Sequence, residues 1–249
     1  MMTYLNIGRM GRFANAMFEI AGTIGIAVQS GQSFAFPQWV NHDAVERFGT
    51  TEDIYLYKHF KNPLPELPHH FDFKEYEYFW GYRYINLPSG DWNFNAHFQS
   101  EKYFLHCKDL IRYYFTMTNE PLDIDATAVH MRFGDYDGSY HPRPDIEYYR
   151  QALVQVPGPY LLFSDDLDAA QRIMSELKVQ YVPIEKDYIE SFKIMKHCKH
   201  FICGNSSYSM MAAILADQKG KIITAPKKWF GDHVGLETVD LYPEGTIII

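Results

Sequence analysis

Residues 126–138 read ATAVHMRFGDYDG, an apolar run of high β propensity that ends in a cluster of charged side chains. His130, Arg132, Asp135 and Asp137 make up this cluster. Polar residues are common where strands end, so the stretch alone is compatible with an ordinary solvent-facing strand end. If the cluster belongs to a functional site, polar residues should also stand at the ends of the neighbouring strands of the same sheet.

Short apolar runs alternate with helical patterns through the C-terminal half of the chain. The sequence predicts strands at residues 127–133, 159–164, 179–184, 200–204 and 221–226, with helices at 165–178, 187–198 and 206–217. Strands that alternate with helices indicate an α/β fold with a mostly parallel sheet. In such sheets ligands bind at the carboxyl ends of the strands.

Polar clusters come directly after three of these strands, so we expect them at one edge of the sheet. The guanidinium of Arg132 is a permanent cation whose forked donors suit phosphate oxygens. A helix start at Ser206 and Ser207 offers hydroxyl and N–H groups to an anion. One of Asp165 and Asp166 caps the next helix, and the other is left to accept from the N–H edge of guanine. Together they indicate a site for a nucleotide diphosphate.

The N-terminal half begins with a short strand at 3–8 and a helix from Phe13 that stops at Gly31. Arg9 and Arg12 flank the turn between them, and Asn15 lies in the first helical turn. The glycines of a dinucleotide fingerprint and the lysine of a P-loop are absent. Residues 37–125 are predicted to be irregular, and the aromatic side chains at 73–98 are expected mostly in the core rather than against sugar rings.

Bulk properties narrow the function classes. The chain has 249 residues, enough for one large or two small domains, and a net charge of −8, which argues against non-specific nucleic-acid binding. Three cysteines suit a reducing compartment. The N-terminus has no signal-peptide pattern, and no apolar stretch reaches the roughly 20 residues of a membrane span. These features predict a cytoplasmic protein with no membrane span.

Several segments resemble glycosyltransferase family 11, the α-1,2-fucosyltransferases. GRFANAMFEIA at 11–21 is similar to the family's Gly-Arg-Leu-Gly-Asn-Gln-Met-Phe-Gln-Tyr-Ala pattern, and FQSEKYF at 98–104 resembles its Gln-Ser-Glu-Lys-Tyr-Phe segment. HMRFGDY at 130–136 resembles the His-x-Arg-Arg-Gly-Asp-Tyr motif. FSDD at 163–166 and CKHFICGNSSYSMMAAILA at 198–216 match two further segments. The matches occur in the family's order.

The resemblance implies a GT-B-like fold of two Rossmann-like domains that face across a cleft. Residues 1–125 would form the acceptor side and residues 126–249 the donor domain. It implies inverting transfer of L-fucose from GDP-β-L-fucose to a glycan hydroxyl, such as O2 of a terminal β-galactoside, without a metal or other cofactor. The implied catalytic residues are Arg132, Asp135 and Asn15. The implied substrate-binding residues are His130, Arg12, Asp165, Asp166, Asn205, Ser206 and Ser207.

Three positions depart from the family pattern and keep other interpretations open. Phe133 stands where the motif has its second Arg, and Ala14 and Ala16 replace a Gly and a Gln. These changes motivate a non-catalytic GDP-sugar-binding protein as an alternative.

The catalytic base is open as well. Asp135 is the first candidate and Asp137 the second. The same two residues form an Asp-x-Asp that would suit a metal-dependent transferase. HCKHFIC at 197–203 lacks the second ligand pair of a zinc site and is better explained as a buried strand.

Overall fold

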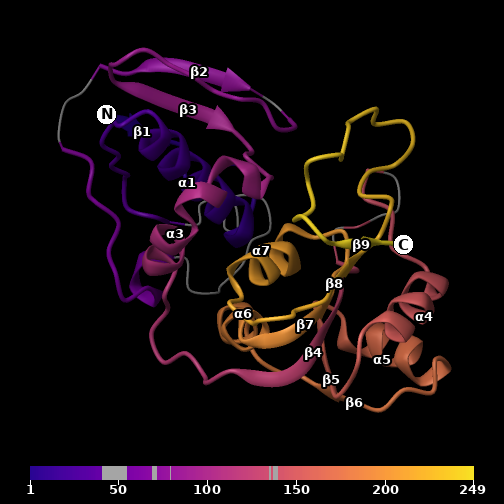
Figure 1. Ribbon diagram of the computed structural model, residues 1–249. Coiled ribbons are helices and arrows are strands. Elements are labelled where there is room, and N and C mark those ends of the chain that lie inside the picture. Colours follow the sequence, from indigo (N-terminus) through magenta and orange to yellow (C-terminus); the bar gives the residue numbers. More distant parts are fainter. Residues whose placement is uncertain (41–54, 69–71, 79, 135, 137–139) are drawn as a thin grey trace. The chain divides into compact units, whose positions relative to one another are not determined.

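The computed structural model describes residues 1–249 except 41–54, 69–71, 79, 135 and 137–139 (Figure 1). The chain forms two compact units. The first comprises Met1–Asn119 with Val239–Leu241, and the second comprises Glu120–Thr238 with Tyr242–Ile249. Among the described residues, no helix is long and apolar enough to cross a membrane. Cys107, Cys198 and Cys203 are all free thiols.

The first unit is built on a three-stranded parallel sheet of order β1-β3-β2. Its strands are β1 (Met2–Thr3), β2 (Lys74–Tyr78) and β3 (Trp92–Ala96). Its helices are α1 (Phe13–Gln29), η1 (Leu56–His59), η2 (Glu101–Tyr103), η3 (Leu105–Cys107) and α3 (Lys108–Tyr114). The helix from Phe13 is confirmed. The strand expected at 3–8 is only two residues long, and residues 37–125 contain two strands and a helix that the sequence patterns did not indicate.

The second unit is a six-stranded, all-parallel sheet of order β6-β5-β4-β7-β8-β9. Its strands are β4 (Ile124–Met131), β5 (Tyr160–Ser164), β6 (Tyr181–Pro183), β7 (Cys198–Ile202), β8 (Ile223–Ala225) and β9 (Ile247–Ile248). Its helices are α4 (Ile146–Gln155), α5 (Leu167–Glu176), α6 (Tyr188–Lys196) and α7 (Ser207–Leu215). The five strands and three helices predicted for this half are confirmed, whereas α4 and β9 were not predicted.

Helices cover both faces of this sheet. Figure 1 shows α4 and α5 on one side and α6 and α7 on the other. The core beneath α4 and α5 is apolar and fully buried, and includes Val129 of β4, Leu162 of β5 and Met174 of α5. Because the chain runs β4, β5, β6 in one direction and then returns to β7, the strand order reverses between β4 and β7. Ligands of open α/β sheets bind outside the carboxyl ends of the strands at such a point.

Candidate active site

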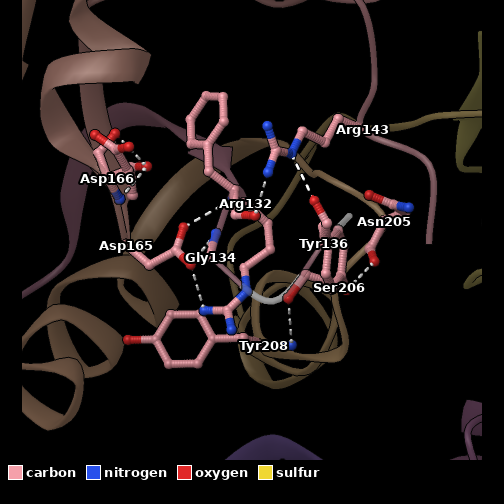
Figure 2. Close-up of polar contacts among 11 residues, drawn as sticks. Arg132, Gly134, Tyr136, Arg143, Asp165, Asp166, Asn205, Ser206 and Tyr208 are labelled. Carbon is pink, nitrogen blue, oxygen red and sulfur yellow. Dashed lines mark hydrogen bonds and ion pairs between the residues drawn. The ribbon is translucent and has the colours of Figure 1, made fainter. Parts of the chain in front are cut away.

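Asp165 belongs to a polar cluster beyond the carboxyl ends of β4 and β5 and is bonded there to Arg132 and the backbone that follows it (Figure 2). Its carboxylate pairs with Arg132, with 2.9 Å between Oδ2 and Nη1. It also accepts the backbone N–H groups of Phe133 at 2.9 Å and Gly134 at 2.8 Å. Hydrogen bonds to a charged group are each worth about 1.5–3 kcal/mol. One carboxylate therefore fixes both the Arg132 guanidinium and the backbone directly after it.

Gly134 is required by this arrangement. A Cβ at this position would lie 2.4 Å from Oδ2 of Asp165, closer than real side-chain contacts come. Any larger residue would push the carboxylate away from the two amides that it accepts. The Gly of the HMRFGDY motif thus has a steric cause.

Among the described residues, Asp166 does not contact this cluster's backbone but caps a helix. It is the N-cap of α5, and its Oδ1 accepts the N–H of Ala169 at 3.0 Å. This confirms that one of the two aspartates caps the helix. The other, Asp165, differs from the expectation of a carboxylate left open to a base, because three donors converge on its two oxygens.

The turn from β7 into α7 borders the same strand ends. Ser206 is the N-cap of α7 and accepts the N–H of Tyr208 at 3.4 Å, and Ser207 is the first residue of the helix. Asn205 is fully buried, and its amide donates to the carbonyl of Pro142 at 2.7 Å. The hydroxyl of Tyr136 donates to the Asn205 carbonyl at 2.7 Å, so the motif after β4 is bonded directly to the start of α7.

His130 is buried on β4, with 5% of its surface exposed, and its ring lies 5.6 Å from that of Tyr208. Burial lowers the pKa of its imidazole to about 4, and the nearby Asp165 carboxylate opposes this shift only in part. The ring is therefore neutral near pH 7. Within the described parts of the chain, its Nδ1 atom is buried without a hydrogen-bond partner.

Helix α4 supports the ends of two strands. The hydroxyl of Tyr149 donates to the carbonyl of His130 at 3.5 Å, and that of Tyr148 donates to the carbonyl of Cys203. Two neighbouring tyrosines of one helix thus satisfy backbone groups at the ends of both β4 and β7, the two strands that flank the reversal of strand order.

In the first unit, two sequence motifs meet at Asn15. Its Oδ1 accepts from Nε2 of Gln99 at 3.0 Å, and its amide lies where a Cβ on Gly11 would sit, 2.1 Å away. Gly11 has a φ of +106°, a conformation that favours glycine. Arg12 is the N-cap residue of α1 and contributes no side-chain cap. The GRFANAM and FQSEKYF segments therefore form one structural feature.

Comparison with known proteins decides the family. The model of glycosyl transferase family 11 matches residues 2–240. The chain belongs to glycosyl transferase family 11. This confirms the resemblance seen in the sequence.

Two curated relatives in Escherichia coli match parts of this family 11 chain. An O-antigen biosynthesis glycosyltransferase, WbnK, is 31% identical over 131 residues, which are 47% of this chain and 43% of WbnK. An alpha-1,2-colitosyltransferase is 26% identical over 180 residues, covering 62% of this chain and 61% of the relative. The chain thus spans about half the length of the curated relatives it matches.

Two solved structures share the fold of this family 11 chain. POFUT1 in complex with GDP-fucose gives a TM-score of 0.50 at 12% identity, covering 100% of this chain and 97% of POFUT1. NodZ alpha-1,6-fucosyltransferase soaked with GDP-fucose gives 0.51 at 13% identity, covering 86% and 92%. The α/β fold is therefore GT-B-like, as expected.

Phe133, which stands where the family motif has a second Arg, contacts both the core and another arginine. The Phe133 side chain packs against the apolar core beneath α4 and α5. The guanidinium of Arg143 lies over its ring at 5.8 Å, and donates to the carbonyls of Tyr136 at 2.7 Å and Phe133 at 3.1 Å. Sequence reasoning missed both Arg143 and Tyr136. Tyr136 belongs to the motif and could have been found there, whereas nothing in the sequence marks Arg143.

Asp135 and Asp137 lie outside the described residues, so their roles as base or metal ligands stay predictions. Among the residues the structure does describe, no three His, Cys, Asp or Glu side chains gather as a metal site. The thiols of Cys198 and Cys203 are buried in or beside β7, and burial raises the pKa of each to about 12. This agrees with the interpretation of HCKHFIC as a buried strand, because metal-binding thiols are deprotonated.

Proposed function

We propose that the protein transfers L-fucose from GDP-β-L-fucose to a hydroxyl of an acceptor glycan, with O2 of a terminal β-galactoside as the expected target. The observation that carries the proposal is the Arg132–Asp165 pair in a chain of family 11. The pair lies beyond the carboxyl ends of β4 and β5, and β4 also borders the reversal of strand order. The relative named as an alpha-1,2-colitosyltransferase and the fucosyltransferases with the same fold support this reaction class.

In the proposed site Arg132 binds the diphosphate of the donor. A guanidinium has five N–H donors, and the contact with Asp165 is made by Nη1. Asp165 can therefore orient the planar fork of the group, whose geometry suits phosphate oxygens. The amino-terminal end of α7, at Ser206 and Ser207, would add partial positive charge. Preorganised donors of this kind are worth roughly 3–4 kcal/mol each when charge develops in a transition state.

The proposed step is a single displacement. The acceptor hydroxyl oxygen bonds the anomeric carbon of fucose from the face opposite the diphosphate, and the bond between that carbon and the β-phosphate oxygen breaks. The electron pair leaves with GDP, whose added charge Arg132 stabilises, and the hydroxyl proton passes to a carboxylate. Asp135 is the first candidate for this base and Asp137 the second. Attack from the opposite face converts the β-linked donor into an α-linked product.

Three alternatives concern the sugar that is transferred, whether the protein turns over its donor, and whether the reaction needs a metal ion. The relative's name favours a colitosyl group as the second candidate for what is transferred. Phe133, Ala14 and Ala16 motivate a protein that binds GDP-sugar without turnover. The Asp135–Asp137 pair motivates a metal-dependent transferase. Guanine recognition by Asp165 or Asp166, and donor contacts of His130, Arg12, Asn15 and Asn205, stay predictions.

The test is a GDP-release assay with GDP-fucose and the corresponding colitosyl donor, with and without a lactose-type acceptor. We expect acceptor-dependent GDP release from GDP-fucose that persists in excess EDTA. GDP binding without release would support the non-catalytic interpretation. Loss of activity in EDTA that Mn²⁺ restores would support the metal-dependent one.

The matched variants are Arg132→Ala, Arg132→Lys and Arg150→Ala. Arg150 is an exposed arginine of α4 that pairs with Glu147 and serves as control. Arg132→Ala should abolish transfer while the protein stays folded, and Lys should restore activity only in part because it lacks the planar fork. Activity of Arg132→Ala within about tenfold of the parent, which is ~1.4 kcal/mol, would remove Arg132 from the site.

A further inference from the structure

Residues 141–143 form a short strap along the outside of the motif that comes after β4. Arg143 donates from Nε to the Tyr136 carbonyl at 2.7 Å and from Nη2 to the Phe133 carbonyl at 3.1 Å. One guanidinium therefore bridges the two carbonyls. Figure 2 shows the Arg143 guanidinium beside Tyr136, on the side of the motif away from the Arg132 guanidinium.

The other two residues of the strap connect the motif to the start of α7. The ring of His141 stacks on that of Tyr136, with centroids 4.8 Å apart and planes 20° from parallel. The carbonyl of Pro142 accepts from the buried amide of Asn205 at 2.7 Å. The same short segment thus contacts the residues beyond β4 and the residues beyond β7.

The motif backbone is consequently held from two sides by opposite charges. The Asp165 carboxylate accepts the N–H groups of Phe133 and Gly134, and the Arg143 guanidinium donates to the carbonyls of Phe133 and Tyr136. The negative carboxylate lies at the positive, N–H end of the peptide dipoles, and the positive guanidinium lies at the negative, C=O end. Hydrogen bonds with one ionised partner are about twice as strong as neutral ones.

The Phe133 ring adds a second contact to Arg143. A cation within about 6 Å of an aromatic face is attracted by the ring, and the Arg143 guanidinium lies 5.8 Å from the centre of the Phe133 ring. The family motif has a second Arg at position 133. In this chain position 133 is Phe, and the guanidinium of Arg143, ten residues later, lies over its ring.

We propose that Arg143 is a positioning residue for the transfer reaction: it holds the motif backbone after Arg132 in the geometry that the reaction requires. The inference rests on the proposed function. Arg132 itself is held by Asp165, which Arg143 does not contact through any hydrogen bond described for it. Removing Arg143 should therefore slow turnover more than it weakens donor binding.

The experiment compares Arg143→Gln, Arg143→Lys and the control Arg150→Gln in steady-state GDP release. We expect Arg143→Gln to lower kcat by about tenfold or more, with KM for GDP-fucose within about threefold of the parent. Lys should restore part of kcat, because an ammonium can donate to one carbonyl but lacks the planar fork. Arg150→Gln should match the parent. An unchanged kcat for Arg143→Gln, or equal losses in Arg150→Gln, would overturn the proposal.

Amide hydrogen exchange provides a readout that is independent of the donor. The N–H groups of Phe133 and Gly134 are bonded to Asp165, and that of Tyr136 to the Phe133 carbonyl. Their exchange should accelerate about tenfold in Arg143→Gln, less in Arg143→Lys and not in Arg150→Gln. If the parent releases no GDP from any donor, the proposed function fails, and this exchange then decides only whether Arg143 holds the motif backbone. Unchanged exchange would overturn it.

Discussion

Asp165 and Asp166 are adjacent residues with the same side chain, but they bind different partners because they occupy different positions after strand β5. Strand β4 pairs with β5 in a register that places Met131 opposite Ser164. The next residues, Arg132 and Asp165, are therefore brought side by side, and their ion pair is a consequence of the register. Asp166 is one residue further on, at the start of α5, where a carboxylate accepts helix N–H groups.

Replacing these aspartates with asparagine should separate their roles. An Asn side chain at 165 presents an N–H₂ group to a cluster of donors, so we expect Asp165→Asn to lose Arg132 orientation and to weaken GDP binding by about tenfold or more. Asn is as good an N-cap as Asp. Asp166→Asn should therefore leave GDP affinity unchanged and shift the free energy of unfolding by less than about 0.5 kcal/mol.

Titration with GDP and with inosine diphosphate checks this assignment. Inosine lacks the exocyclic amine that a guanine-binding carboxylate would accept. If Asp165 acts by holding Arg132, its variant weakens both ligands by the same factor, which is our expectation. A selective loss for GDP would instead support guanine recognition by this residue, and a loss only in Asp166→Asn would reverse the two roles.

At the scale of elements, helix α1 contains two glycines that its neighbours explain. A Cβ on Gly25 would lie 2.0 Å from the carbonyl oxygen of Tyr103, and one on Gly22 would lie 2.5 Å from the ring of Phe98. His106 contacts the Gly25 carbonyl at 3.0 Å. The glycines let the FQSEKYF segment approach the backbone of the helix that begins in the family's first motif.

Gly25→Ala should therefore destabilise the protein. In an unobstructed helix interior this change gains about 1 kcal/mol. Here the added methyl group meets backbone rather than a flexible side chain, so we expect a net loss of roughly 1–3 kcal/mol in the free energy of unfolding. Chemical denaturation measures it, with Val28→Ala on the exposed face of the same helix as control. A gain in stability for Gly25→Ala would show that the two segments separate easily.

Elements differed in how well the sequence predicted them. Strands β4, β5 and β7 each contain apolar residues of high β propensity between helical patterns, so hydrophobic patterning located them. Strand β2 has the half-exposed sequence KEYEY and pairs with β3. Strand β3 in turn pairs with β1, where Met2 lies opposite Trp92, some ninety residues away in the sequence. Such pairings depend on tertiary contacts that no local pattern carries. Helix α4, with the sequence IEYYRQALVQ, packs into the core through Tyr148, Tyr149 and Ala152, a buried face of tyrosines and alanine rather than of large aliphatic side chains.

The sequence predicted where the candidate site lies on the sheet, but not which of its residues contact one another. Parallel topology places the residues after β4, β5 and β7 at one edge, which located Arg132, the two aspartates and Ser206. Which aspartate meets Arg132 depends on strand register, and the bridge from Arg143 to the motif depends on a loop conformation. Neither can be deduced from the identity of the residues.

On the scale of the whole molecule, each unit brings together its own motifs. The first unit joins Asn15 to Gln99, and the second joins Arg132, Asp165 and Asn205 through Tyr136 and the strap. The boundary lies between Asn119 and Glu120 and returns briefly at Val239–Leu241. Each unit therefore has an ordered set of polar contacts that its own sheet positions.

Global stability should depend on pH through His130. Its pKa is about 4 in the folded protein, against 6.5 for an unperturbed histidine, because burial disfavours the charged ring. Between these values the unfolded chain binds more protons than the folded one, so stability falls as the pH falls from about 6.5 to 4. Above this window the contribution is fully present. The shift corresponds to at most roughly 3.5 kcal/mol, since one pKa unit equals about 1.4 kcal/mol.

Urea denaturation of the parent, His130→Gln and His233→Gln across this window measures the effect. The pKa values of His97 and His200 are lowered by burial as well, so the parent's total loss contains their contributions too. Only the difference between parent and His130→Gln belongs to His130, and it should approach one proton in the middle of the window. His233 is exposed, so His233→Gln serves as the matched control for replacing a histidine with glutamine. If His130→Gln keeps the parent's slope, the ring is protonated inside the fold near pH 5, and the Asp165 carboxylate, not burial, decides its charge.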